Sequence, residues 1–298
     1  MEYQTLLKCL ISETETYCKN NHISALVLGI SGGIDSTIVS VIANQVCKNL
    51  GIPFIGRSLP IKNQSDEYEV SLKVGKAFCT DFKSTNLSHL YNETLKFIKG
   101  AEGINTDDTK IANGNIQARL RMSYLYNLAS INKGLVLSTD NQTEYQLGFW
   151  TVHGDVGDFD PIQNLWKTEI YELAKWLIED YQDKIEQIYS IGNDATEFLI
   201  RKEAIEASMA LTPTDGLGIS NSDIEQLGVN SYAELDEILK GILEIESIKE
   251  PILRVPKSYE LYKKYGKDKV LIVASRHQKS EFKRQKAPIC ISREILES

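Results

Sequence analysis

Long apolar runs are missing from this sequence of 298 residues, and so is the basic, then apolar, beginning of a secretory signal peptide. We therefore expect no transmembrane helix and a cytoplasmic protein. Basic charge is also scarce, because 33 Lys and Arg residues face 41 Asp and Glu residues and leave a net charge of −8. That balance argues against a broad nucleic-acid-binding surface, which usually needs a basic stripe.

Cysteine is sparse and scattered. The sequence has five cysteines, at Cys9, Cys18, Cys47, Cys79 and Cys290, and no C-x-x-C pair. An odd number without paired spacing is typical of reduced thiols in the cytosol and argues against a zinc site or a redox pair.

One local stretch departs from the acidic balance. "RHQKSEFKRQK" at 276–286 has six basic residues, counting histidine, against one acid. It is either a local binding surface or the solvated end of a helix, and the sequence leaves both readings open.

Strand-like and helix-like segments alternate between residues 24 and 140. Short apolar runs bounded by glycine or proline predict strands at 24–30, 51–56 and 135–140. Longer amphipathic runs predict helices at 2–20, 36–50, 66–79, 92–100 and 109–134, the last ending at Gly134. The alternation predicts an α/β fold: a doubly wound parallel sheet flanked by helices.

Beyond about residue 165 the pattern becomes helical. It predicts additional C-terminal helices at 168–181, 195–210, 231–245 and 258–278. The polar stretches 100–108 and 211–223 read as loops, and we expect mobile segments at 100–109 and 209–223. Since no stretch reads as a linker, we expect residues 1–298 to form a single domain.

The stretch "VLGISGGIDSTIVS" at 27–40 carries the strongest functional signal. A strand that stops at Ile30 and a helix that starts near Ser36 leave "SGGID" at the carboxyl end of a parallel strand, where ligands bind. Two glycines free the backbone N–H groups, and the helix N-terminus adds further donors. The pattern predicts an anion cradle suited to a polyphosphate. The purely structural alternative is that Gly32 and Gly33 form a tight turn and that Asp35 and Ser36 cap the helix.

Asp35 fits an anion site only if a divalent cation lies between it and the phosphates. Mg²⁺ prefers one or two carboxylates together with phosphate oxygens, so Asp35 is a candidate magnesium ligand. No lysine follows the glycines as in G-x-x-x-x-G-K-[ST], so transfer of a terminal phosphate is not indicated. We expect Asp35 to be exposed, so that its loss would leave folding nearly intact.

S-G-G-x-D-S after a buried strand resembles the pyrophosphate loop of the ATP-pyrophosphatase superfamily. Three further stretches, at 114–126, 135–177 and 213–218, follow in the order and spacing of ammonia-dependent NAD synthetases, and the resemblance covers about residues 24–288. It implies an adenine nucleotide alpha-hydrolase-like fold and a ligase that uses ATP and Mg²⁺. The carboxylate of deamido-NAD would attack the α-phosphate, giving an adenylate and pyrophosphate, and ammonia would then release AMP and form NAD.

The resemblance also implies roles for individual residues. ATP phosphates would lie against Gly29, Ile30, Ser31, Gly32, Gly33, Ile34, Asp35 and Ser36. Thr139, Lys167 and Thr214 match ATP-contacting positions, and Lys167 is also a catalytic candidate. Asp35 and Glu144 match the metal-binding carboxylates. Arg119, Asp158 and Lys283 match deamido-NAD contacts, and Asp155 matches an aspartate near the reacting carboxyl group that would help ammonia lose its proton.

Each assignment has a structural alternative. Arg119 could be a surface residue, Glu144 a cap, and Asp155 and Asp158 turn formers among glycines. The sequence also departs from the family pattern: Val152 stands where many relatives have a lysine, Phe282 where a histidine often precedes the basic pair, and Arg57 lies one place early. These departures concern the dinucleotide contacts rather than the adenylation.

Only about 24 residues precede the first expected strand, too few for an amidase domain, so we expect free ammonia or ammonia from a separate protein. The resemblance implies a homodimer. Two other functions stay open on the sequence: another pyrophosphate-loop enzyme, such as one that modifies tRNA or makes GMP, and an adenine-nucleotide sensor without chemistry. The acidic charge argues against tRNA, and the pair Asp35 and Glu144 favours an enzyme.

Overall fold

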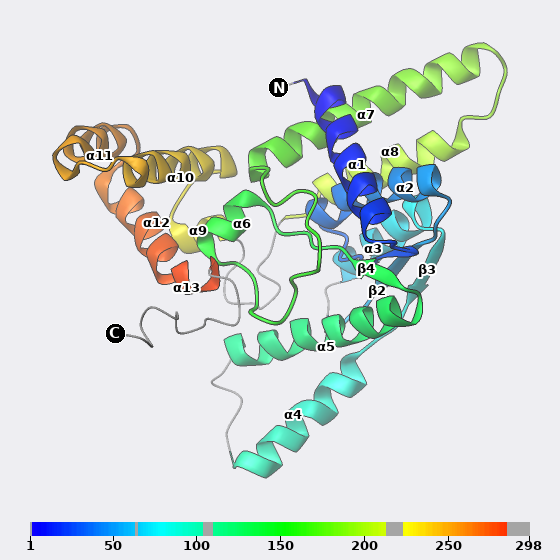
Figure 1. The fold of residues 1–298 in the computed structure, drawn as a ribbon, viewed down its shortest axis with the longest axis horizontal. Coiled ribbons are helices and arrows are strands. Elements are labelled where there is room, and N and C mark those ends of the chain that lie inside the picture. The colour runs from blue at the N-terminus through cyan, green and yellow to red at the C-terminus, as the bar shows by residue number, and fades with distance from the viewer. Residues whose placement is uncertain (1, 63–64, 104–109, 213–222, 285–298) are drawn as a thin grey trace.

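The computed structural model describes residues 2–62, 65–103, 110–212 and 223–284. Within these residues, four strands form one parallel sheet in the order β3-β2-β1-β4. The strands are β1 (Ala25–Gly29), β2 (Phe54–Ser58), β3 (Asp81–Ser84) and β4 (Gly134–Val136). Strand β1 lies between β2 and β4, and at its carboxyl end Leu28 and Gly29 pair with β2 alone (Figure 1).

Helices cover both faces of this sheet. The first face carries α1 (Tyr3–Asn20), α2 (Ile34–Leu50), α3 (Ser65–Phe78), α7 (Lys167–Ser190) and α8 (Thr196–Met209). The second face carries α4 (Ser88–Glu102) and α5 (Lys110–Ile131). Alternate residues of β1 serve the two cores: Leu26 and Leu28 belong to the first and Ala25 and Val27 to the second. The predicted doubly wound α/β fold is thus confirmed.

A third hydrophobic cluster lies beside the sheet. It surrounds Leu147 at the end of α6 (Gln142–Leu147) and is built mainly from α10 (Tyr232–Ser247) and α12 (Lys267–Lys279), with α9 (Asp223–Leu227). Helix α11 (Pro251–Tyr265) packs on α10 and α12, and the short α13 (Glu281–Arg284) follows α12 back to α6. Figure 1 shows these C-terminal helices as a group on one side of the molecule.

Four expectations about the elements were wrong. The helix expected at 109–134 ends at Ile131, and Gly134 begins β4 instead of ending the helix. The edge strand β3 was missed, because its four residues are partly or fully exposed and show no apolar run. The strand expected at 135–140 ends at Val136, with only an isolated bridge from Leu137 to Phe159 beyond it. The helix expected at 258–278 is broken at Gly266, whose φ of 88° no helix accommodates.

The two expected loops are only partly within the described residues. Helix α4 continues to Glu102, so the loop expected from residue 100 begins later. Most of the expected loop at 211–223, and residues 104–109, lie outside the described residues. Among the helices that are described, none combines the length and the apolar character needed to cross a membrane.

Candidate active site

The turn between β1 and α2 has open backbone donors at its centre. We call residues 30–33 the glycine loop. The first hydrogen bond of α2 runs from Thr37 N to Gly33 O (3.1 Å), so the N–H groups of Ile34, Asp35 and Ser36 have no acceptor within the helix. The N-cap residue is Gly33, not Asp35 or Ser36, and within the described residues no side chain of the N-cap position bonds this end of the helix. The alternative of a simple helix cap at Asp35 and Ser36 is therefore wrong, and the end of the helix is suited to an anion.

Gly32 shows why the loop requires glycine. Its φ is +93°, and a Cβ there would lie 2.6 Å from the carbonyl oxygen of Glu67 and 2.9 Å from the nitrogen of Ser71, both in α3. From α8, the hydroxyl of Ser208 donates to the carbonyl of Gly32 at 2.7 Å. The loop is thus packed against α3 and α8 on one side, and among the described residues Ser31 is exposed on the other side.

The remaining loop residues have distinct roles. Gly29 ends β1, and Ile30 donates its N–H to the carbonyl of Arg57 at 2.8 Å, which continues the strand pairing by one residue. Ser31 is exposed and accepts a hydrogen bond from Gly33 N, and the buried hydroxyl of Ser36 lies 3.0 Å from that of Ser31. Ser31 is thus the exposed residue of the turn and bonds both Gly33 and Ser36.

Asp35 and Glu144 converge on one cation, the ammonium of Lys167. The Nζ atom lies 2.5 Å from Asp35 Oδ2 and 2.9 Å from Glu144 Oε1. The Lys167 side chain is only 3% exposed. Burial lowers the pKa of Lys167, but the two carboxylates outweigh burial and hold that pKa well above its ordinary value. Asp35 is 15% exposed rather than open to solvent, so the expectation of an exposed ligand was wrong.

This pair of carboxylates fits a magnesium ion. Two side chains that reach the same ammonium can also reach the same divalent cation, and carboxylates with phosphate oxygens are what Mg²⁺ prefers. No group of three or more His, Cys, Asp or Glu side chains within the described ranges is placed to hold a metal. Phosphate oxygens and water would supply the remaining ligands.

Asn141 is a site residue that the sequence analysis missed. Its fully buried side chain donates from Nδ2 to Asp35 Oδ1 at 2.9 Å and accepts from Glu144 N at 3.0 Å, where it caps α6. It thus joins the carboxylate of Asp35 to the backbone of Glu144. An asparagine three residues before a glutamate is a known helix-start pattern, and this signal could have found it.

A second buried network fixes the start of α7. Asp236 of α10 accepts hydrogen bonds from Thr143 Oγ1 (2.6 Å) and from both N and Oγ1 of Thr168, and Thr143 Oγ1 in turn accepts from Lys167 N. Desolvation raises the pKa of Asp236. This aspartate, also missed, ties α6, α7 and α10 together around Lys167.

Thr139 and the 155–160 stretch lie beside β4 and its continuation, through bonds such as Asp158 N to Val136 O at 2.8 Å and Ser138 N to Phe159 O at 2.9 Å. Thr139 follows β4, the neighbour of β1, and is half-buried. Asp155 Oδ1 accepts from Thr151 N at 2.6 Å; solvent reaches this carboxylate, yet desolvation by the surrounding protein raises its pKa. Desolvation also raises the pKa of Asp160 to about 7. A carboxyl group with a raised pKa suits proton transfer near neutral pH.

The three predicted dinucleotide contacts all bind the protein itself. Asp158 accepts from Tyr126 OH (3.0 Å) and Val136 N (3.2 Å). Arg119 is exposed and donates to the carbonyl of Val152 at 3.2 Å. Lys283 Nζ donates to the carbonyls of Gly148 (2.6 Å) and Trp150. Their roles toward a substrate stay predictions, and Thr214 lies outside the described residues.

The sequence departures have different structural outcomes. Arg57 is 3% exposed and pairs with Asp81 across the β2–β3 edge at 2.8 Å, so it belongs to the sheet and not to the site. Phe282 is 57% exposed. Val152 is half-buried, with its carbonyl on Arg119. None of the three presents a charged group to the carboxylates of the site.

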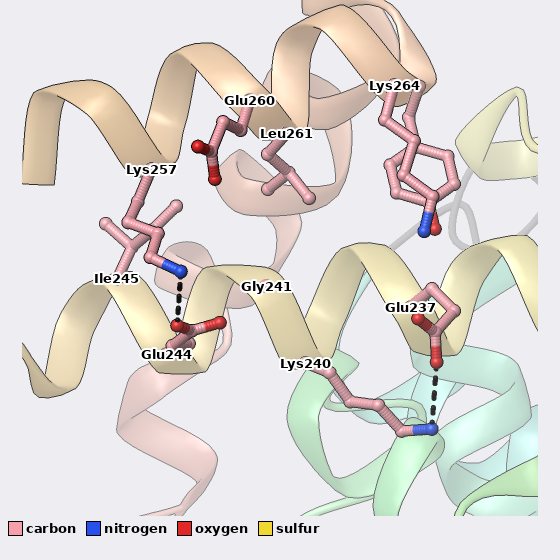
Figure 2. Close-up of a pocket in the computed structure, with 10 residues that line it drawn as sticks. Glu237, Lys240, Gly241, Glu244, Ile245, Lys257, Glu260, Leu261 and Lys264 are labelled. Carbon is pink, nitrogen blue, oxygen red and sulfur yellow. Dashed lines mark hydrogen bonds and ion pairs between the residues drawn. The ribbon is translucent and has the colours of Figure 1, made fainter.

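A separate hollow of about 290 Å³ lies between α10 and α11 (Figure 2). It is lined by lysines and glutamates that largely neutralise one another, with ion pairs from Lys257 to Glu244 (3.0 Å) and from Lys240 to Glu237 (3.2 Å). None of its lining residues belongs to the glycine loop or to the group Asp35, Glu144 and Lys167. We assign no ligand to it.

Comparison with known proteins identifies the chain's relatives. The family model described as NAD synthase matches residues 6–287. The chain is 30% identical to "NH(3)-dependent NAD(+) synthetase" of Thermoplasma acidophilum over 73% of its own length and 77% of the relative's. It is 29% identical to the protein of the same name from Thermococcus sibiricus over 97% of both chains.

Solved structures show the same fold. "Structure of NMN synthetase from Francisella tularensis" superposes with a TM-score of 0.72 at 22% identity and covers 98% of this chain and 100% of that one. The NH3-dependent NAD synthetase of Campylobacter jejuni, in complex with a nitrate ion, gives 0.69 at 23% identity with the same coverage.

Proposed function

This chain belongs to the NAD synthase family, and we propose that it amidates deamido-NAD with ammonia at the expense of ATP, through an adenylated nicotinate carboxylate that releases pyrophosphate and then AMP. The amidation of deamido-NAD to NAD, by an enzyme of the ligase class, follows from the family. The observation that carries the site assignment is the convergence of Asp35 and Glu144 on Lys167 beside the open end of α2.

Backbone and side-chain groups at the start of α2 and around Lys167 support the binding of ATP. The N–H groups at the start of α2 point to where the β- and γ-phosphates would lie, because a helix N-terminus favours anions. Asp35 and Glu144 would hold Mg²⁺, which supplies positive charge to the leaving pyrophosphate. The ammonium of Lys167, which contacts both carboxylates, can stabilise negative charge that develops on the α-phosphate.

The second step needs a neutral amine and a proton acceptor. Ammonia attacks the acyl carbon of the adenylate, the bond to the AMP oxygen breaks, and the attacking nitrogen gives up a proton. Asp155 is accessible, fixed by Thr151 N, and has a raised pKa, which suits acceptance of that proton. We assign it this role, with Arg119, Asp158 and Lys283 as the dinucleotide contacts.

The oligomeric state and location belong to the same proposal. Leu90 and Phe97 lie seven residues apart on one face of α4 and are 49% and 77% exposed, and Ile111 of α5 is 61% exposed. Such an apolar surface is suited to a second copy of the chain, and we propose a homodimer. We further propose one domain and a cytoplasmic enzyme supplied with free ammonia.

The test is to incubate the protein with Mg²⁺-ATP, ammonium and deamido-NAD carrying ¹⁸O in its carboxylate. We expect NAD and AMP in equal amounts, with label in AMP, since a carboxylate oxygen attacks phosphorus and leaves with it. ADP in place of AMP, or unlabelled AMP, would contradict the adenylate. Turnover of nicotinic acid mononucleotide with none of deamido-NAD would contradict the dinucleotide substrate.

A further inference from the structure

Four residues in the described part of the basic stretch, 276–284, point toward α6. Three of its side chains converge on the carbonyl of Gln146: Arg284 Nη1 at 2.7 Å, His277 Nδ1 at 2.9 Å and Ser280 Oγ at 3.2 Å. Arg276 Nε donates to the next carbonyl, that of Leu147, at 2.9 Å. The reading of this stretch as a solvated helix end is thus wrong for these residues.

These donors meet a local need of α6. The helix has only six residues, and the last carbonyls of a helix have no partner within it. Charge-assisted hydrogen bonds from guanidinium groups satisfy such carbonyls and are stronger than neutral ones. We call Arg276, His277, Ser280 and Arg284 the C-terminal clamp.

Gly148, which ends α6, shows how closely the clamp approaches. Its φ is +64°, and a Cβ there would lie 2.5 Å from the Cβ of Ser280 and 3.0 Å from Cδ of Lys283. Arg276 also stacks on the ring of Phe149, with the guanidinium carbon 4.6 Å from the ring centroid. Contacts on both sides of Gly148 therefore fix the direction in which the chain leaves α6.

The other end of α6 is the active site. Asn141 caps the helix and binds Asp35, and Glu144, in the first turn, binds Lys167. Glu144 lies two residues before the Gln146 carbonyl on which the clamp converges. Because α6 is barely more than one turn long, a shift at its C-terminal end is carried directly to Glu144.

We propose that Arg276 and Arg284 are positioning residues for the amidation, which hold the end of α6 and through it the carboxylate of Glu144. This inference rests on the proposed role of Glu144 in the metal site. Neither arginine touches substrate atoms in this proposal. Arg284 carries the larger share, since its second nitrogen also donates to the carbonyl of His277 at 3.0 Å and so links α6 to α12.

The experiment compares Arg284→Ala, Arg284→Lys and Arg276→Ala with the wild type. Lys279→Ala is the matched control, because it removes a positive charge from an exposed position of α12. The first readout is Mn²⁺ binding, followed by electron paramagnetic resonance, with an ATP analogue whose α- and β-phosphorus atoms are joined by methylene. The second is steady-state NAD formation, with kcat and the KM for deamido-NAD measured separately.

We expect Arg284→Ala to weaken Mn²⁺ binding and to lower kcat by about tenfold each, with the KM changed by less than about twofold. Arg276→Ala should do the same more weakly, and the control should match the wild type. Lysine at 284 keeps the charge but cannot reach both carbonyls, so Arg284→Lys should fall between wild type and alanine.

A folded Arg284→Ala variant with wild-type Mn²⁺ affinity and kcat would overturn the inference. If that variant does not fold, Arg284→Lys decides in its place, and wild-type behaviour there would overturn it equally. A wild type that binds the analogue and Mn²⁺ without making NAD would contradict the proposed function. The ratio of variant to wild-type Mn²⁺ affinity would then still decide the positioning role.

Discussion

The glycine loop and the segment 141–160 supply the two halves of the site in different ways. At the glycine loop, some bonds join residues a few positions apart, such as Gly33 with Thr37 and with Ser31, while Ile30 pairs with Arg57 and Ser208 donates to Gly32 from α8. The segment 141–160 depends on partners far along the chain: Asn141 binds Asp35 across 106 positions, and Gln146 binds Arg284 across 138. We therefore expect the glycine loop to depend on the packing of α3 and α8 behind it, and the segment 141–160 to depend on Asp35 and on the C-terminal helices.

The largest expected effect tests whether the two halves form one site. Asp35→Asn and Glu144→Gln each remove one of the two carboxylates on Lys167, and we expect each to lower kcat by about 100- to 1,000-fold. NAD formation measures it, and Glu172→Gln, in an exposed ion pair of α7, is the control. If Glu144→Gln kept near-normal turnover, the segment 141–160 would not belong to the metal site.

The next effect separates folding from binding within the glycine loop. Gly32→Ala places a Cβ against the backbone of α3 at a positive φ, so we expect unfolding to become easier by about 2 kcal/mol or more. Gly33 has a φ of −67°, and its nearest atom to a new Cβ is Ser31 Oγ at 3.4 Å. Gly33→Ala should therefore fold normally, and Gly33→Val should weaken ATP binding by obstructing its approach.

Urea unfolding and calorimetric titration with an ATP analogue measure the two quantities. A Gly33→Val variant with unchanged affinity would count against nucleotide binding on this face of the loop. A Gly32→Ala variant as stable as the wild type would show that α3 can move to accommodate the new Cβ. The packing of α3 would then not be what requires glycine at this position.

The smallest effect concerns the pH dependence of the segment 141–160. Desolvation raises the pKa of Asp160 from 3.8 to about 7 in the folded protein. Between these values the unfolded chain loses the proton and the folded one keeps it, so this group lowers stability as pH rises from about 4 to 7. The melting temperature of Asp160→Asn minus that of the wild type should therefore be about 4 °C higher at pH 8 than at pH 5.

Thermal unfolding in EDTA at both pH values measures this difference without metal binding. Asp194→Asn is the control, because that carboxylate is on the surface and its pKa is lowered by Thr196 instead of raised. A relative melting temperature that did not change with pH would mean that Asp160 is ionised throughout.

The sequence predicts the features that depend on contiguous residues better than those that depend on residues far apart in the chain. The strand before the glycine loop and the start of α2 were predicted closely, because the apolar run, the glycine pair and the helical pattern are contiguous signals. Strand β3 was missed because no apolar run marks it, and the break at Gly266 because helical periodicity continues on both sides. The clamp on Gln146 could not be predicted, since no local pattern records which carbonyl a distant arginine will reach.

Gly32 has one more consequence, for the rate at which nucleotide is captured. Since α3 and α8 already hold the backbone of the loop in its bent form, an arriving triphosphate has little chain left to order. The association rate of the nucleotide should then be limited by diffusion and desolvation rather than by slow rearrangement of the turn. Differences in ATP affinity between natural variants of the enzyme should accordingly lie mainly in the dissociation rate of the nucleotide.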